Sequence, residues 1–122
     1  MLFNELFIIL ALLFIKHFLV DFIFQTTEQI KNKGSYGHLK GIEHSIQHGV
    51  GTSFALFPFV GWEVALLLGA VDSGIHYHID WVKMNINQRW NHTVNSSQFW
   101  TWFGADQLAH SLTYIWLVWL LF

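Results

Sequence analysis

Histidine and aspartate side chains recur four residues apart along this chain, and together they have the chemistry to bind a metal ion. The sequence has eight His residues and no Cys, so any metal would be held by imidazole, carboxylate, amide or water and not by thiolate. Because an α-helix makes one turn in about 3.6 residues, residues at i and i+4 share one helix face. In chain order the sets are His17, Asp21 and Gln25; His44 and His48; Asp72, His76 and Asp80; and Asp106 and His110.

The polar sets lie in four apolar segments that could cross a membrane as helices, which takes about 20 residues each. The sequence is 53% hydrophobic and only 11% charged, whereas a soluble domain carries about 25% charged residues. The first segment lacks the basic start and small-residue cleavage site of a signal peptide, so we expect a retained helix. We therefore predict one all-α domain over residues 1–122, an integral membrane bundle of four transmembrane helices at 2–24, 42–59, 62–84 and 99–122.

Basic residues predict the orientation of this bundle. Two long polar segments, 26–41 and 85–98, lie on one side, and the helices between them are joined by a tight turn at residues 60–61. The basic residues outside the first helix lie in or beside these two segments: Lys31, Lys33, Lys40, Lys83 and Arg89. The positive-inside rule therefore predicts that both long loops are cytoplasmic and both termini are outside.

In this orientation all four polar sets lie at one depth, in the cytoplasmic half of the bundle. The first and third helices run inward and carry their sets late, whereas the second and fourth begin inside and carry theirs early. Placing one charge at the centre of a membrane helix costs about 2.5–3.5 kcal/mol. Four carboxylates would also repel one another unless a cation neutralises them. A metal ion supplies that charge, and helix bundles build such sites from His and carboxylates on facing helices.

We predict one or two divalent transition-metal ions of the Zn, Mn or Fe type, because His and carboxylate ligands do not choose among these metals. The predicted metal ligands are His17, His44, His48, His76, Asp80, Asp106 and His110. Gln25, Gln107 and Lys83 are predicted to contact a substrate or to brace the ligands. A carboxylate beside the ligands, Asp21 or Asp72, is the predicted general base.

The same residues resemble the motifs of a family of small multi-pass bacterial and phage membrane proteins of unknown function. The motifs are His-x3-Asp-Phe-x2-Gln, His-x3-His, His-x3-Asp-x2-Lys and Asp-Gln-x2-His, found here at residues 17–25, 44–48, 76–83 and 106–110. They span nearly the whole chain, and Asp72 lies outside them. The family has a distant likeness to membrane-bound metal-dependent hydrolases. The resemblance implies a multi-pass protein of the bacterial inner membrane with a metal-dependent activity.

Our leading hypothesis is a metal-dependent hydrolase that cleaves a lipid-linked ester or phosphoester at the cytoplasmic leaflet. One alternative is a non-catalytic membrane protein whose metal or polar core is structural and which binds a membrane partner from a phage or its host. A proton or metal transporter is less favoured, because the outer halves of the helices are nearly all apolar. A surface rich in Phe and Trp suits either lipid or a second copy of the chain. The sequence has no basic patch of the kind that would indicate nucleic-acid binding.

Overall fold

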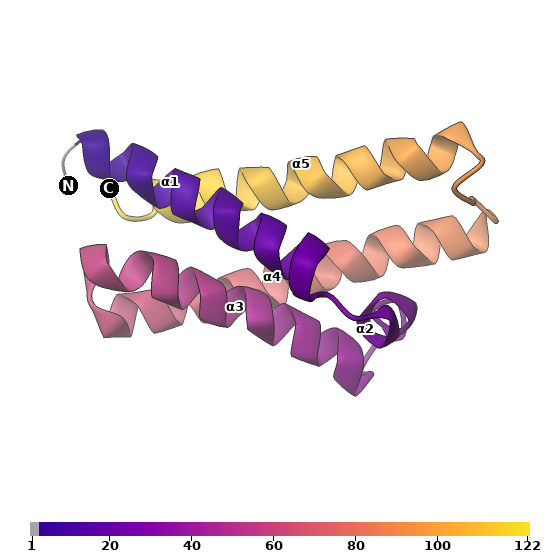
Figure 1. Cartoon of the computed structure of the whole chain (residues 1–122), viewed down its shortest axis with the longest axis horizontal. Helices are drawn as coiled ribbons and strands as arrows, with labels where there is room; N and C mark the ends of the chain where they lie inside the picture. Colours follow the sequence, from indigo (N-terminus) through magenta and orange to yellow (C-terminus); the bar gives the residue numbers. More distant parts are fainter. Residues whose placement is uncertain (1–2) are drawn as a thin grey trace.

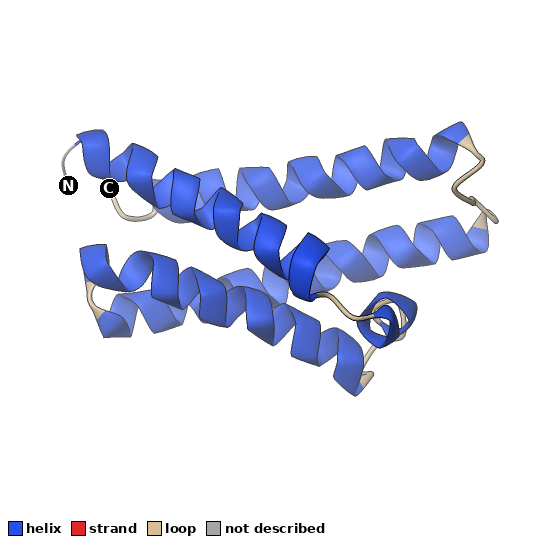
Figure 2. Cartoon of the chain, viewed as in Figure 1, coloured by secondary structure: helices blue, strands red, loops and turns tan. Residues whose placement is uncertain are grey.

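The computed structural model describes residues 3–122, and all the regular structure of these residues is helical (Figure 2). The elements are α1 (Phe3–Phe18), a π-helical turn (Leu19–Phe24), α2 (Thr27–Asn32), α3 (Leu39–Val60), α4 (Trp62–Arg89) and α5 (Ser97–Trp119). The all-α prediction is confirmed for this part of the chain. The four predicted segments correspond to the four long helices, the first of which is completed by the π-helical turn; residue 2 lies outside the described residues. Both predicted loops are shorter than expected, because α3 begins at Leu39, α4 continues to Arg89 and α5 begins at Ser97; α5 itself ends at Trp119.

Each of the four long helices runs along the bundle once, in alternating directions (Figure 1). The start of α1, the end of α5 and the α3–α4 turn lie at one end, and α2 and the α4–α5 loop lie at the other. Gly61 forms the turn with φ +79°, a left-handed conformation that glycine adopts without steric cost. The elements that carry the polar sets are therefore antiparallel neighbours, as their predicted depth requires.

Residues 26–41, predicted to be a polar loop, contain the short helix α2. It begins with a capping box, in which the Thr26 hydroxyl accepts a hydrogen bond from the Gln29 backbone at 3.2 Å while the Gln29 side chain accepts one from the Thr26 backbone at 3.0 Å. The buried Gln29 amide then donates to Gln47 of α3 at 3.2 Å. Six residues are too few to show a hydrophobic period, so this helix has only its capping signal in the sequence.

Polar side chains fill much of the interior of the bundle, and large apolar side chains cover its outside. The apolar core lies at the end that holds the α3–α4 turn and includes Ile9, Leu13, Leu56 and Leu117. Among the described residues, more polar or charged side chains than apolar ones are buried, while Phe54 and Trp119 are 76% and 68% exposed. Water-soluble proteins more often bury their large apolar side chains and expose their charged ones. One described helix, Phe3–Phe24, is by length and composition apolar enough on its own to cross a membrane.

Helices α3 and α4 touch backbone to backbone at two glycines. A Cβ atom added at Gly69 would overlap the Gly49 carbonyl and the Ser53 hydroxyl. The Ser53 hydroxyl lies 3.0 Å from both the Gly49 and the Ala65 carbonyl oxygens, which ties the two helices together. Small residues at such contacts are a common packing device of membrane helices. This contact fixes the register between the polar sets of α3 and α4.

Gly69→Ala is expected to destabilise the bundle, because overpacking of this kind costs about 1–3 kcal/mol. Gly74→Ala on the same helix is the matched control, since nothing lies within 4 Å of its added Cβ atom. In a helix interior, replacing Gly by Ala stabilises by about 0.5–1 kcal/mol. Thermal unfolding in detergent, followed by circular dichroism, compares the two variants. Equal melting temperatures would contradict the close α3–α4 contact.

Candidate metal centre

The predicted polar sets meet inside the bundle, where every long helix contributes to one buried cluster. The members are His17 from α1, Asp21 from the π-helical turn, His44 and His48 from α3, Asp72, His76 and Asp80 from α4, and Asp106 and His110 from α5. None of these side chains is exposed. The shared helix faces and the common depth inferred from the sequence thus correspond to real proximity.

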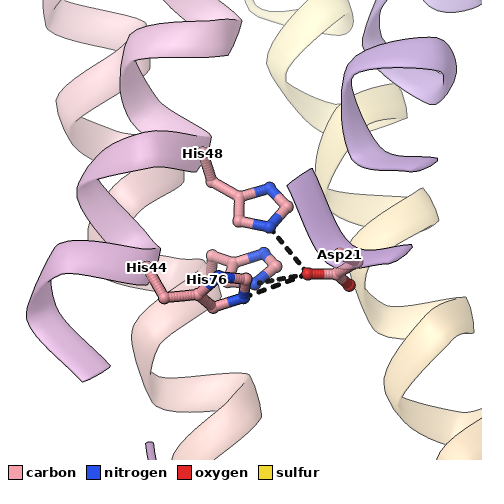
Figure 3. A group of neighbouring side chains, drawn as sticks. All are labelled: Asp21, His44, His48 and His76. Atoms are coloured by element: carbon pink, nitrogen blue, oxygen red, sulfur yellow. Dashed lines mark hydrogen bonds and ion pairs between the residues drawn. The ribbon is translucent and has the colours of Figure 1, made fainter. Parts of the chain in front are cut away.

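The π-helical turn at Leu19–Phe24 aims Asp21 at α3. Such turns are rare and are frequently found at functional sites. One Asp21 oxygen, Oδ2, lies 3.1 Å from His17 Nε2, one turn earlier. The other, Oδ1, lies 3.0 Å from His44 Nε2 and 2.8 Å from His48 Nε2 (Figure 3).

Four atoms from three segments lie at distances from one another that suit ligands of one metal ion. Asp21 Oδ1 lies 3.0 Å from His44 Nε2 and 3.7 Å from His76 Nε2. Asp80 Oδ2 lies 3.5 Å from His44 Nε2 and 3.2 Å from His76 Nε2. Ligand bonds of about 2.0–2.1 Å around a tetrahedral zinc ion place neighbouring ligand atoms about 3.3–3.4 Å apart. These four of the six possible separations scatter around that value, and we call the four atoms the first ligand set.

Unsatisfied polar atoms support this interpretation. Both ring nitrogens of His44 and His76, together with Asp80 Oδ2 and Asp106 Oδ1, are buried and make no hydrogen bond of good geometry, although four of these six atoms lie within ion-pair distance of an opposite group. A buried polar group without a partner costs about 1–3 kcal/mol, so such groups are rare unless something else binds them. An ion held by the two Nε2 atoms and Asp80 Oδ2 would engage three of the six. The residues present therefore fit a divalent metal.

A second ligand set adjoins the first through Asp80. His110 Nε2 lies 3.3 Å from Asp80 Oδ1 and 3.4 Å from Asp106 Oδ1, again near the tetrahedral spacing. The rings of His76 and His110 stack with their centroids 3.9 Å apart. Asp80 thus offers one oxygen to each set, and a carboxylate in this position can bridge two ions. His76, Asp80 and His110 also have ligand atoms that all lie within 4.8 Å of one another.

His48 belongs by distance to the group formed by Asp21, His44 and His76. Its Nδ1, however, lies 3.3 Å from the Lys16 ammonium, which can only donate. The Nε2 atom therefore carries the ring proton and donates it to Asp21 Oδ1. In this arrangement His48 orients Asp21, in the manner of the outer-shell partners that align metal ligands.

His17 and Gln107 form a hydrogen-bonded chain beside the ligands. His17 Nδ1 accepts from the Tyr114 hydroxyl at 2.8 Å, and His17 Nε2 donates to Gln107 Oε1 at 2.9 Å. The Gln107 amide in turn donates to Asp106 Oδ2 at 3.1 Å. Both nitrogens of His17 are thus engaged, so here it braces Asp21 and offers no free ligand atom. The bracing role predicted for Gln107 agrees with this geometry.

Asp72, a predicted general base, lies outside both ligand sets. Its Oδ2 accepts hydrogen bonds from Thr52 Oγ1 at 2.5 Å and from Lys16 Nζ at 2.9 Å. Lys16 also donates to the Tyr114 hydroxyl at 3.1 Å. Lys16 was not predicted as a site residue, although a lysine within an apolar helix next to His17 was a signal. Asp72 and Lys16 form a buried ion pair that supports His48.

Two further lysines reach the cluster at its α2 end. Lys83, predicted to contact substrate or ligands, lies 3.2 Å from Asp106 Oδ2. Lys33 Nζ lies 3.3 Å from Asp80 Oδ2 and donates to Gln25 Oε1 at 2.9 Å. Gln25 therefore contacts Lys33, and Lys33 contacts the cluster. From the sequence, Lys33 was used only to predict the orientation of the bundle. Gly34 brings it close, because a Cβ atom there would lie 2.8 Å from Met84 Cβ on α4.

The fold and the cluster together define a class, a small all-helical protein whose antiparallel long helices enclose a buried His/Asp site able to hold a metal ion. The chain belongs to the family described as "Protein of unknown function (DUF3307)", whose model matches residues 9–122. This confirms the expected membership in a family of unknown function, and the description says nothing of membranes, phages or hydrolysis. No curated protein and no solved structure matches the chain significantly.

His76→Ala is expected to remove bound metal. The His76 ring lies within ligand distance of Asp21, His44 and His48, and also of Asp80 and His110. Elemental mass spectrometry of detergent-purified protein offered Zn²⁺ or Mn²⁺ should find one or two equivalents in the parent chain and at least a tenfold loss of affinity in the variant. His78→Ala is the matched control, since this exposed ring bonds Tyr36 and the Gly74 carbonyl and stays outside the cluster. Metal retained equally by both variants would refute the site.

Proposed function

We propose that this protein is an integral membrane protein whose four long helices cross the bilayer around a metal centre. The observation that carries the proposal is the inverted distribution of side chains, with carboxylates, imidazoles and lysines inside and large apolar side chains outside. Lipid is a good solvent for such a surface, whereas in water an apolar patch of this extent favours aggregation. Interior ionisable groups of membrane bundles pair with one another and mark functional sites.

The charge distribution supports the predicted orientation. Exposed basic residues of the described chain, among them Lys31 and Lys40, lie at the α2 end of the bundle, and Arg89 ends α4 on the same side. The opposite end, with the α3–α4 turn at Gly61, has none. By the positive-inside rule the α2 end is cytoplasmic. We therefore propose a multi-pass protein of a bacterial inner membrane with both termini outside.

The absence of native cysteine allows a clean test of this topology. Glu63→Cys, in the first turn of α4, should react with a membrane-impermeant maleimide on intact spheroplasts, whereas Lys31→Cys in α2 should react only after permeabilisation. Each exposed site serves as the control for the other. Labelling of Lys31→Cys on intact cells, or recovery of the protein in the soluble fraction, would refute the proposed arrangement.

The second ligand set supports metal-dependent hydrolysis as the activity. It has three protein atoms, Asp80 Oδ1, Asp106 Oδ1 and His110 Nε2, and catalytic metal sites commonly keep a fourth position open for water or substrate. A divalent ion there would activate water as a nucleophile near neutral pH. Of the predicted general bases, Asp21 already contacts ligand nitrogens and Asp72 is paired with Lys16, so either would first have to exchange partners to accept a proton.

The first ligand set favours a second candidate function, a structural metal. With four protein ligands it would be a closed site, and closed sites stabilise folds instead of binding substrate. A chain with both sets can contain one ion of each kind. A protein with only the structural ion would act by binding a membrane partner and not by catalysis.

Turnover of lipid substrates distinguishes the two functions. Metal-loaded protein should hydrolyse a lipid phosphoester or ester, and Asp106→Asn should slow it by about 10–100-fold because the anionic carboxylate becomes a neutral amide. His78→Ala should retain full activity, since its ring lies outside the cluster. Phosphate or fatty-acid release measures the rate. A preparation with bound metal that cleaves neither class, and that unfolds when the metal is chelated, would establish the structural function instead.

A further inference from the structure

Lys33 and Lys83 enter the cluster from outside the two ligand sets. Lys33 follows α2, and Lys83 lies on α4 one turn beyond Asp80. Their side chains are only 7% and 11% exposed, and their ammonium groups lie 3.3 Å from Asp80 Oδ2 and 3.2 Å from Asp106 Oδ2. A lysine near a membrane interface usually extends its charge toward water. These two point inward, toward the carboxylates of the metal site.

The cluster carries excess positive charge when metal is bound to neutral imidazoles. Four carboxylates and three lysines, with neutral imidazoles, leave one net negative charge; the lysines are Lys16, Lys33 and Lys83. One divalent ion makes the cluster positive by one charge, and two ions make it positive by three. Excess charge in a buried site is costly unless it is paired. The metal-loaded cluster therefore favours the binding of an anion, with a charge that depends on the number of ions.

Lys33 and Lys83 are the lysines placed to contact that anion. Their carboxylate partners, Asp80 and Asp106, contribute oxygens to the ligand sets, so a bound metal would draw the negative charge of these partners away from the ammonium groups. Lys16 differs, because its partner Asp72 lies outside both sets and stays paired with it. Gln25 Oε1, 2.9 Å from Lys33 Nζ, would hold that lysine in place.

We infer that Lys33 and Lys83 bind the phosphate group of the ligand beside the metal centre. This inference rests on the proposed function and selects the phosphoester from its two substrate classes, because a neutral carboxyl ester offers no charge to two ammonium groups. Phosphate oxygens accept hydrogen bonds from lysine and also bind metal ions. Lys33 directly follows α2, which lies at the end proposed to face the cytoplasmic headgroups, and Lys83 contacts the same carboxylate, Asp80. A lipid headgroup or free phosphate could supply the same group.

Phosphorus NMR on the full chain tests the inference. Protein loaded with paramagnetic Mn²⁺ in dodecyl maltoside, which contains no phosphorus, is titrated with inorganic phosphate and separately with short-chain phosphatidic acid. Fast relaxation of the phosphorus signal reports binding next to the metal. Stronger binding of phosphatidic acid would identify a lipid headgroup as the source, and stronger binding of inorganic phosphate would identify the free ion. Relaxation of neither ligand by metal-loaded protein would overturn the inference.

Lys33→Gln and Lys83→Gln should each weaken phosphate binding at least tenfold while the metal content, measured first, is unchanged. Lys40→Gln is the matched control, because Lys40 is exposed and pairs with Glu43 at 2.7 Å. If both cluster variants bind phosphate with the same affinity as the Lys40→Gln control, the inference is overturned and the proposed function is left intact. No metal in the parent chain would overturn the proposed function itself. Where a Gln variant loses its fold, the Met variant of the same lysine, which keeps the apolar stem, replaces it under the same criteria.

Discussion

Four carboxylates lie buried at one level of the bundle, and their negative charge has to be balanced there. Lys16, Lys33 and Lys83 come from three different segments to pair with Asp72, Asp80 and Asp106. Asp21 instead faces only imidazole nitrogens among its close contacts. Every long helix supplies at least one partner, so pulling any of them away would leave a buried charge unpaired, at a cost of about 3–5 kcal/mol.

The bundle therefore has two halves that are held together by different interactions. Near the α3–α4 turn, Ile9, Leu13 and Leu56 pack by shape, as in an ordinary core. Toward α2 the helices are joined by ion pairs and hydrogen bonds, and their large apolar side chains face outward. The close contact at Gly49 and Gly69 links the halves, because it sets how far α3 may slide along α4 before His44 and His76 lose their common partners.

The sequence predicted the helices and the gathering of the polar sets well, because both follow from spacing and depth. Roles within the cluster depend on which atom faces which, and spacing does not contain that information. His17 was predicted as a ligand, yet the Tyr114 hydroxyl and Gln107 engage both its nitrogens. Asp21 was predicted beside the ligands, yet a π-helical turn with no sequence signature brings it among them. Lys33 was missed because Thr26 and Gln29, which cap α2, were not recognised as a helix start.

The contrast between the first helix and the others has a consequence for how such a chain would enter a bilayer. Phe3–Phe24 is apolar enough to partition by itself, whereas α4 carries Asp72, His76, Asp80 and Lys83 and would pay for each of them if it entered alone. If the bundle spans the membrane as proposed, α3 and α4 would do better to insert together as a hairpin closed at Gly61, with Thr52 and Asp72 already bonded. Insertion would then be sequential: Phe3–Phe24 would enter the bilayer first, and α3 and α4 would follow together.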